Sequence, residues 1–237
     1  MPSIKSAART AGLLYLLNSA LAPFSLLYIP STFIVAGDAT ATANKIRASQ
    51  FLFRTGIADE LVSATIFIFV GLAFYHLLKA VNKKQALLLL ILVLISVPMS
   101  FLNELSRLTA LTLSRGATFL AVFDQRQVDA LVMALLNLHG SGLLLIQIFW
   151  GLWLFPFGFL VFKSGFVPRT LGILLIIAGV GYVASSFTSL LFPAYGHDVF
   201  MLAGLFGGIG EGGTILWLLI MGAKDQQLAQ PLPHPST

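Results

Sequence analysis

The sequence predicts an all-α membrane protein, a polytopic bundle of six transmembrane helices with both termini in the cytoplasm. Three observations lead to this prediction. Hydrophobic residues make up 57% of the 237-residue chain and charged residues only 10%, whereas a soluble domain carries about 25% charged residues. Six apolar segments are each long enough to cross a bilayer, which takes about 20 residues. Basic residues gather at alternate ends of those segments, as the positive-inside rule describes.

The predicted spans run approximately over residues 11–34, 51–78, 86–108, 136–162, 171–191 and 200–222. The first is longer than the apolar core of a signal peptide, about 7–15 residues, so we predict that it is retained as a helix. Proline residues predict kinks in the first, third and fourth spans, at Pro23, Pro98 and Pro156. Residues 1–224 therefore form one predicted transmembrane domain, and residues 225–237, polar and rich in proline, form a predicted disordered cytoplasmic tail.

The connections between the spans set the predicted orientation. Eight of the fourteen Lys and Arg residues fall on one side: Lys5, Arg9, Lys79, Lys83, Lys84, Lys163, Arg169 and Lys224. The positive-inside rule assigns that side to the cytoplasm. The net charge of +5 thus reflects topology, and no nucleic-acid partner is expected. On the opposite side, Asp124 followed by Gln127 predicts a capped helix start, which we interpret as a pre-helix at the outer interface leading into the fourth span.

Charged residues within the spans are the candidate functional residues, because each costs roughly 2.5–3.5 kcal/mol at the centre of a membrane helix. Counting from the basic ends at about 1.5 Å per residue places most of them in the outer half of the bilayer and Glu211 near its middle. They predict a polar pocket that opens outward and contains Arg54, Asp59, Glu60, Asn103, Glu104, Arg107, His139 and Glu211. Four acids against two arginines favour a cation, an amine or a shared proton as the ligand.

Helical periodicity groups some of these residues on common faces. One stripe holds Ser100, Asn103, Glu104 and Arg107, and a second holds Thr55, Asp59 and Ser63. Arg54 is off the Asp59 face, so we expect it to reach the headgroups or an acid on a neighbouring helix. In the sixth span, Gly204, Gly208 and Gly212 predict a face that another helix backbone approaches closely.

Three functions fit these observations. The leading interpretation is binding or transport of a small molecule or ion. The alternative is an intramembrane enzyme acting on a lipid or isoprenoid, with Glu211 or Asp59 as general base and His139 as acid, although no serine-nucleophile, HExxH or paired aspartate-rich motif supports it. The third is a structural or partner subunit in which ion pairs only fix the packing. Membrane lipid is an expected partner in all three, and the oligomeric state is open.

Metal and cofactor chemistry has little basis in the sequence. The chain has no cysteine, which excludes disulfides and thiolate ligands. His139, Asp59 and Glu211 would hold a metal only if their helices converged, so no metal site is predicted. The Gly208-x-Gly210-x-x-Gly213 pattern lacks the strand that a dinucleotide-binding fingerprint requires, and the sequence indicates no particular cofactor.

Several segments together resemble a known family. They are FLFRTGIADELV, FYHLLKAVNKKQALL, NLHGSGLLLIQIFWGLWLFPFGFLVFKSGFVPRTLGILLIIAGVGY and IGEGGTILWLL. In these segments the chain resembles the bacterial membrane proteins grouped as domain of unknown function 4386. The resemblance covers nearly the whole chain, implies a multi-helix fold in a bacterial inner membrane, and points to Arg54, Asp59, His139 and Glu211 as motif positions. It implies no particular activity.

The absence of cysteine makes the predicted orientation directly testable. We expect a membrane-impermeant maleimide applied to intact cells to label a Lys45→Cys variant and to leave a Lys83→Cys variant unlabelled, because the two positions lie in connections on opposite sides. Permeabilised cells provide the control, in which both variants are labelled. Labelling of Lys83→Cys alone in intact cells would invert the topology.

Overall fold

The structure, a computed structural model, describes residues 3–116 and 118–223. The predicted tail at 225–237 and Lys224 lie outside this part of the chain. The described residues form nine α-helices, a π-helical turn and a short 3-10 helix, and no strand. The predicted all-α class is confirmed.

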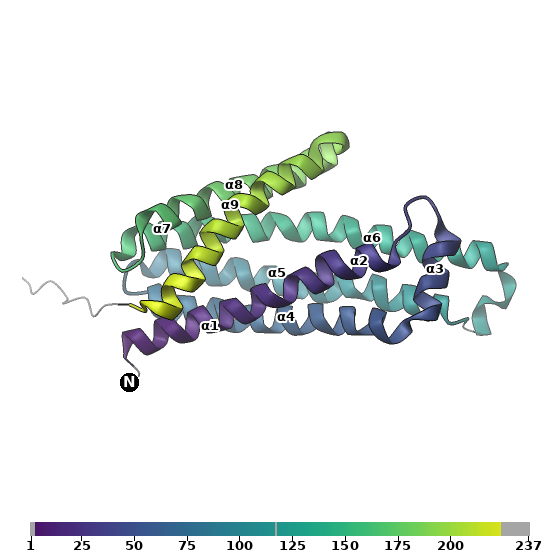
Figure 1. The fold of residues 1–237 in the computed structure, drawn as a ribbon, viewed down its shortest axis with the longest axis horizontal. Helices are drawn as coiled ribbons and strands as arrows, with labels where there is room; N and C mark the ends of the chain where they lie inside the picture. Colours follow the sequence, from purple (N-terminus) through teal and green to yellow (C-terminus); the bar gives the residue numbers. More distant parts are fainter. Residues whose placement is uncertain (1–2, 117, 224–237) are drawn as a thin grey trace, which may run out of the picture.

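Six helical segments are long and apolar enough to cross a membrane, which confirms the predicted number of spans. The first combines α1 (Ile4–Pro23), the π-helix η1 (Phe24–Tyr28) and α2 (Ile29–Phe33). The others are α4 (Gln50–Leu78), α5 (Lys83–Ser114), α6 (Gln125–Leu152) with α7 (Leu154–Ser164), α8 (Arg169–Leu191) and α9 (Pro193–Ile220). Figure 1 shows that α4, α5 and α6 run along the long axis of the molecule, that α9 crosses it obliquely, and that α1 begins and α9 ends at the same end. Which end faces the cytoplasm stays a prediction.

The helix starts and interruptions follow from local sequence. Asp124 and Gln127 form the predicted capping box, but the helix then continues from Gln125 to Leu152 without a break. The predicted pre-helix is therefore the first part of α6 itself and leads directly into the fourth span, while its position at the interface stays a prediction. Pro23 is followed by the π-helix η1, and Pro156 lies just after the break between α6 and α7, whereas α5 runs uninterrupted through Pro98.

The helices contact one another in a ring. Moving around it, α1 packs on α4, α4 on α5, α5 on α6, α6 and α7 on α8, α8 on α9, and α9 returns to α1. The contact between α9 and α1 is made near the start of α1, where a Cβ on Gly12 would lie 3.1 Å from the Cβ of Leu218. From there α9 diverges from α1 towards its hairpin with α8 (Figure 1).

Paired glycines let α8 approach α6 and α7 closely. A Cβ on Gly151 would lie 2.7 Å from the carbonyl oxygen of Gly179, and a Cβ on Gly158 would lie 2.6 Å from that of Gly172. The predicted contact face of α9 is different. A Cβ on any of its three glycines, Gly204, Gly208 and Gly212, would meet nothing within 4 Å. That prediction is wrong, because α9 is rotated so that Gly207 and Gly210 face α8 instead.

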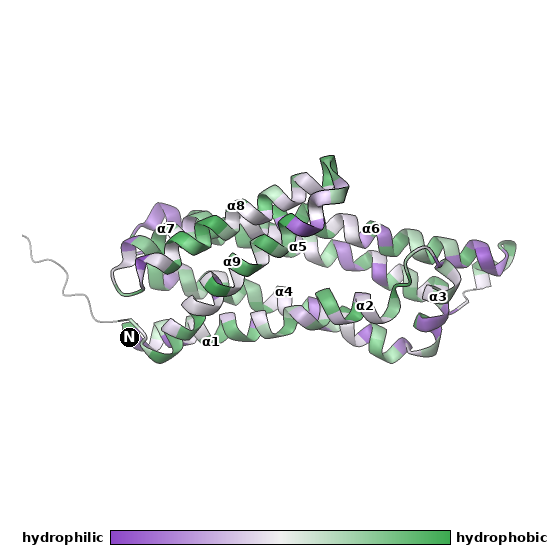
Figure 2. Ribbon diagram, turned by 45° about the horizontal axis from the view of Figure 1, so that its top comes forward, coloured by the Kyte–Doolittle hydropathy of each residue, from purple (hydrophilic) through white to green (hydrophobic). Residues whose placement is uncertain are grey.

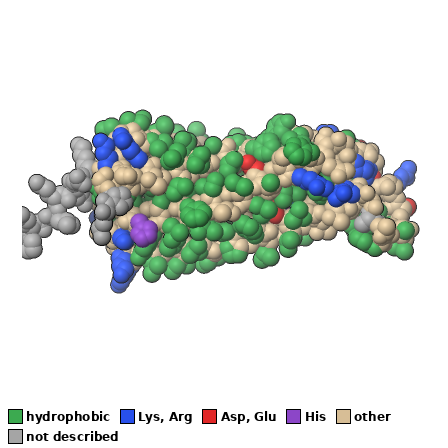
Figure 3. Space-filling view, turned by 90° about the horizontal axis from the view of Figure 1, so that it is seen from below, with side chains coloured by type: hydrophobic (Ala, Val, Ile, Leu, Met, Phe, Trp, Pro, Cys, Tyr) green, Lys and Arg blue, Asp and Glu red, His purple; other side chains and the backbone are tan. Residues whose placement is uncertain are grey.

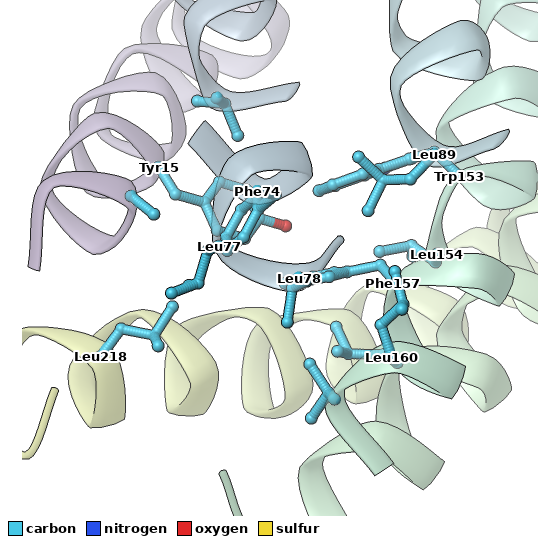
Figure 4. Packing of buried hydrophobic residues seen from close by; sticks show 14 of the residues in the cluster. Tyr15, Phe74, Leu77, Leu78, Leu89, Trp153, Leu154, Phe157, Leu160 and Leu218 are labelled. Carbon is cyan, nitrogen blue, oxygen red and sulfur yellow. The ribbon is translucent and has the colours of Figure 1, made fainter. Parts of the chain in front are cut away.

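Two separate apolar clusters fill the bundle. The larger one, at the end where α1 begins, is built around Tyr15, Phe74, Trp153 and Phe157, whose rings pack at centroid distances of 4.4–6.5 Å. Figure 4 shows that these residues come from α1, α4 and the α6–α7 segment and that Leu218 joins them from α9. The smaller cluster, at the opposite end, includes Phe33, Phe53 and Val132.

The smaller cluster lies at the end of the bundle where α6 begins, and the α6–α7 segment is longer than a bilayer crossing requires. The α6–α7 segment has 40 residues, about 60 Å of helix, which is twice the thickness of a typical hydrocarbon core. The short helix α3 (Ala39–Ala48) crosses this end (Figure 1) and is fixed to α6 by Arg47, whose Nη1 lies 2.8 Å from Oδ1 of the buried Asp129. Hydrophilic residues gather on α3 and at the start of α6 in Figure 2.

The glycine contacts predict that glycine-to-alanine substitutions change the stability of the protein differently at buried and at open positions. We expect Gly158→Ala to lower the stability of the purified protein by about 1–3 kcal/mol, because the new Cβ would press on the backbone of α8. The matched variant Gly208→Ala adds the same group in open space, where alanine is the better helix former, and is expected to retain or raise the melting temperature in detergent. Equal melting temperatures for the two variants would contradict the helix crossing.

Candidate functional site

A layer of polar side chains separates the two apolar clusters. Its members come from α4, α5, α6 and the π-helical turn, and they meet at one height along the bundle. We use the term polar layer for Ser25, Asp59, Glu60, Asn103, Glu104, Arg107 and His139. Five of them, Ser25, Glu60, Glu104, Arg107 and His139, are less than 9% exposed.

Glu104 lies at the centre of this layer. Its Oε1 is 3.3 Å from Nη1 of Arg107, one turn further along α5, and 2.8 Å from Nε2 of His139 on α6. The second distance requires that one of the two groups donates a proton to the other. Since Glu104 is 1% exposed, these two partners replace the water that an exposed carboxylate would have.

Arg107 makes only part of the hydrogen bonds that a guanidinium can make. It lies over the ring of Phe53, with its Cζ 5.6 Å from the ring centroid. Its Nη2 is buried and has no hydrogen-bond partner among the described residues. Gly56 makes room for this nitrogen, because a Cβ there would lie 3.0 Å from Nη2 and 2.6 Å from Cγ1 of Ile29.

Glu60 faces the same layer from α4. Its Oε2 accepts a hydrogen bond of 2.9 Å from the Ser25 hydroxyl, and its carboxyl group interacts electrostatically with Glu104, Arg107 and His139. Ser25 lies in η1, directly after Pro23. A π-helical turn holds an extra residue per turn and changes the rotation of the helix around its axis, so the direction of the Ser25 hydroxyl depends on this turn. The neighbouring Asp59 is half-buried, and its Oδ2 has no hydrogen-bond partner among the described residues.

Asn103 connects α5 to the backbone of α6. Its Nδ2 donates to the carbonyl oxygen of His139 over 3.1 Å, and its side chain fills the space beside Gly142, where any Cβ would collide with it. The predicted stripe on α5 is therefore brought to the layer as expected. The predicted stripe on α4 reaches the layer only in part. Asp59 lies in the layer and interacts with Ser25 and Arg107, whereas Thr55 bonds to its own helix and Ser63 accepts a hydrogen bond from Asn18.

Two predicted site residues lie apart from the layer. Arg54 is exposed and has no hydrogen bond or ion pair with the described residues. Glu211 accepts a hydrogen bond from the Tyr15 hydroxyl on α1 and interacts electrostatically with Tyr182 on α8. Tyr15 precedes Ser25 by ten residues, about 15 Å of helix, so Glu211 is well below the layer. A single pocket containing all eight predicted residues is not formed, because α9 packs on α8 and α1.

A row of polar contacts along the first span, in α1 and η1, lies between the polar layer and the Tyr15–Glu211 pair. Asn18 donates through Nδ2 to the carbonyl oxygen and the hydroxyl of Ser63 on α4, both over 2.9 Å. Ser63 is one turn from Glu60, and Asn18 is one turn from Tyr15. We use the term α1 column for Ser25, Asn18 and Tyr15 with their partners Glu60, Ser63 and Glu211.

Sequence reasoning missed most of the α1 column. Tyr15, Asn18 and Ser25 are uncharged, so the energetic argument that selects charged residues passes over them. The signal that was available is their spacing of three and seven residues on one apolar helix, together with Pro23. Among the described residues, no group of three His, Asp or Glu side chains is placed to hold a metal ion.

The fold and the polar layer together define a multi-pass helical membrane protein with ionisable groups inside the bundle. Within that class, the chain belongs to the family described as domain of unknown function 4386, which it matches over residues 10–222. It is also similar to an uncharacterised protein of Archaeoglobus fulgidus, with 40% identity over 77 residues, which are 32% of this chain and 44% of that protein. The chain thus spans less than half of that relative's length. No solved structure matches the chain.

The contacts of Arg107 predict that replacing this residue lowers the stability of the protein. We expect Arg107→Gln to lower the stability of the purified protein by about 3 kcal/mol or more, because Glu104 keeps its burial and loses its cationic partner. Arg54→Gln removes the same charge from an exposed position of α4 and is expected to change stability by less than about 0.5 kcal/mol. Thermal unfolding in detergent, followed by tryptophan fluorescence, measures both. A smaller effect at Arg107 than at Arg54 would contradict the described layer.

Proposed function

We propose that this protein binds a proton or a small cation inside the membrane, through the carboxyl groups of the polar layer. In this proposal both termini face the cytoplasm of a bacterial inner membrane, and the layer lies in the outer half of the bilayer. The observation that carries the proposal is the charge composition of the layer. Three carboxyl groups, on Asp59, Glu60 and Glu104, face one guanidinium and one imidazole.

With all three acids ionised, the layer would hold buried negative charge that lowers the stability of the protein. Buried ion pairs are tolerated when the charges match and the remaining hydrogen bonds are satisfied, and here the acids exceed Arg107 even when His139 is protonated. A bound proton or cation removes the excess. The unpaired Oδ2 of Asp59 is an acceptor that a cation would use, and carboxylate oxygens are suitable ligands for hard cations.

The close contacts of the layer favour a ligand of this size over a larger metabolite. Glu104 bonds to both Arg107 and His139, and Glu60 bonds to Ser25. These side chains therefore bond mainly to one another and leave few groups for a large ligand. The α1 column supports transport of the bound proton or cation as well as binding, because it places hydroxyl and amide groups between the layer and the Tyr15–Glu211 pair. In this proposal the protein carries the proton or cation along α1.

The two other interpretations receive less support. An intramembrane enzyme with Glu211 as base and His139 as acid needs these residues near one substrate, and they bond to different partners on different helices. With Asp59 as base, both groups lie in the polar layer, but His139 is already bonded to Glu104. A purely structural role would explain the Glu104 ion pairs, but it gives no reason for three acids where one arginine is present.

The experiment compares proton and cation binding in matched variants. We expect the detergent-purified protein to be stabilised either by Na⁺ or K⁺ over choline at equal ionic strength, or by lowering the pH. Asp59→Asn and Glu104→Gln should reduce that response by at least about half, because each removes one carboxyl group from the layer. The control Asp198→Asn removes an exposed carboxyl group of α9 outside the layer and should respond as the wild type does.

Difference infrared spectroscopy of the carboxyl band on changing pH identifies proton binding directly. If Asp59→Asn and Glu104→Gln change only the melting temperature, and leave the cation and pH responses equal to those of Asp198→Asn, the binding proposal fails and the structural interpretation stands.

A further inference from the structure

An open hollow of about 380 Å³ lies between the first turns of α1 and the last turn of α9. It is at the end of the bundle where α1 begins, and Figure 3 shows Lys and Arg side chains at this end as well as at the other, with hydrophobic surface between them. Its lining includes two cations, Lys5 and Arg9, two hydroxyl groups, on Ser6 and Thr10, and two leucines, Leu13 and Leu219. It shares no residue with the polar layer or with the α1 column.

The lining changes from polar to apolar along the membrane normal. Lys5, Ser6 and Arg9 occupy the first turns of α1, and Leu13 follows eight residues after Lys5, about 12 Å deeper. Leu13 is 50% exposed. A phospholipid presents the same order, with a charged phosphate at the interface and acyl chains below it.

Packing between α1 and α9 gives the hollow a defined shape. Gly222, at the end of α9, has a left-handed backbone (φ 68°), and a Cβ on it would lie 2.8 Å from Cγ of Lys5. The aliphatic part of Lys5 therefore lies against Gly222. On the other side, Gly12 brings α1 against Leu218 and Leu219. Neither Lys5 nor Arg9 has an ion pair with the described residues, so both cations are available to a ligand.

We propose that this hollow binds one anionic phospholipid. Lys5 and Arg9 hold the phosphate through charge-assisted hydrogen bonds, Ser6 and Thr10 donate to the headgroup oxygens, and Leu13 and Leu219 contact the first carbons of an acyl chain. A second hollow at the same end, lined by Asn82, Phe159 and Lys163 among others, offers a single cation and no hydroxyl side chain. It does not match the same ligand.

Native mass spectrometry of the full chain in detergent tests this proposal, with phosphatidylglycerol and phosphatidylcholine as probes. We expect one phosphatidylglycerol to bind in preference to phosphatidylcholine. The double variant Lys5→Gln/Arg9→Gln should weaken phosphatidylglycerol binding by about tenfold to thirtyfold, given the contribution of each basic residue near an anionic lipid. The control double variant Lys83→Gln/Lys84→Gln removes two exposed charges at the same end, from the start of α5, and should bind as the wild type does.

Three results would overturn the proposal. If the control variant weakened phosphatidylglycerol binding equally, the effect would be one of net charge and not of this hollow. Unchanged binding in Lys5→Gln/Arg9→Gln would place the lipid elsewhere. Displacement of phosphatidylglycerol by inorganic phosphate would identify a site for free phosphate that makes no use of the leucines. Because all four substituted residues are exposed and outside the polar layer, the cation and pH responses of both variants should equal those of the wild type, which separates this test from that of the proposed function.

Discussion

The carboxyl group of Glu104 is hydrogen-bonded to Arg107 on its own helix and to His139 on the next, and the packing of this half of the bundle depends on the arrangement. Hydrocarbon offers no water to replace a lost partner, so the three side chains have to stay at one height. That requirement fixes the register of α5 against α6, and Asn103 reinforces it by bonding to the backbone at His139. Gly56 and Gly142 follow from the same constraint, because any larger residue would occupy the space of Arg107 or Asn103.

The other half of the bundle is held by different means. There, the rings of Tyr15, Phe74, Trp153 and Phe157 fill the interior, and the glycine pairs bring α8 against α6 and α7. Without a hydrophobic driving force between helices in lipid, close packing of this kind is a main source of association. The molecule therefore combines a densely packed apolar half, which resists rearrangement, with a half in which the polar layer lies next to the smaller apolar cluster.

Hydropathy and charge predict the positions of residues along the membrane normal better than their positions around it. The six spans, the capping box at Asp124 and the stripe at Asn103, Glu104 and Arg107 follow from local periodicity, and the structure contains them. Whether Glu211 meets the other acids depends on how α9 is rotated and tilted against α1 and α8, and hydropathy carries little information on either. The same rotation places Gly207 and Gly210, rather than the regularly spaced glycines, against α8. The helix α3 was also missed, since its ATATANKIRA sequence carries too few apolar residues to be recognised as part of a membrane protein.

Among the described residues, the first span bonds both to the polar layer, through Ser25 of η1 to Glu60, and to the Tyr15–Glu211 pair, through Tyr15 of α1. The π-helical turn after Pro23 lies directly beside the upper contact, and such turns accommodate changes of register more readily than regular helix. A change of charge at Glu60 alters its hydrogen bond with Ser25, and any resulting rotation of α1 also moves Tyr15 relative to Glu211. The first span thus connects the polar layer to the Tyr15–Glu211 pair, and α9 contacts this span mainly near the start of α1. In the proposed function, this arrangement gives a proton or cation in the layer a physical means to influence Glu211, whose carboxyl group interacts with Tyr15 and Tyr182 and has no basic partner among the described residues.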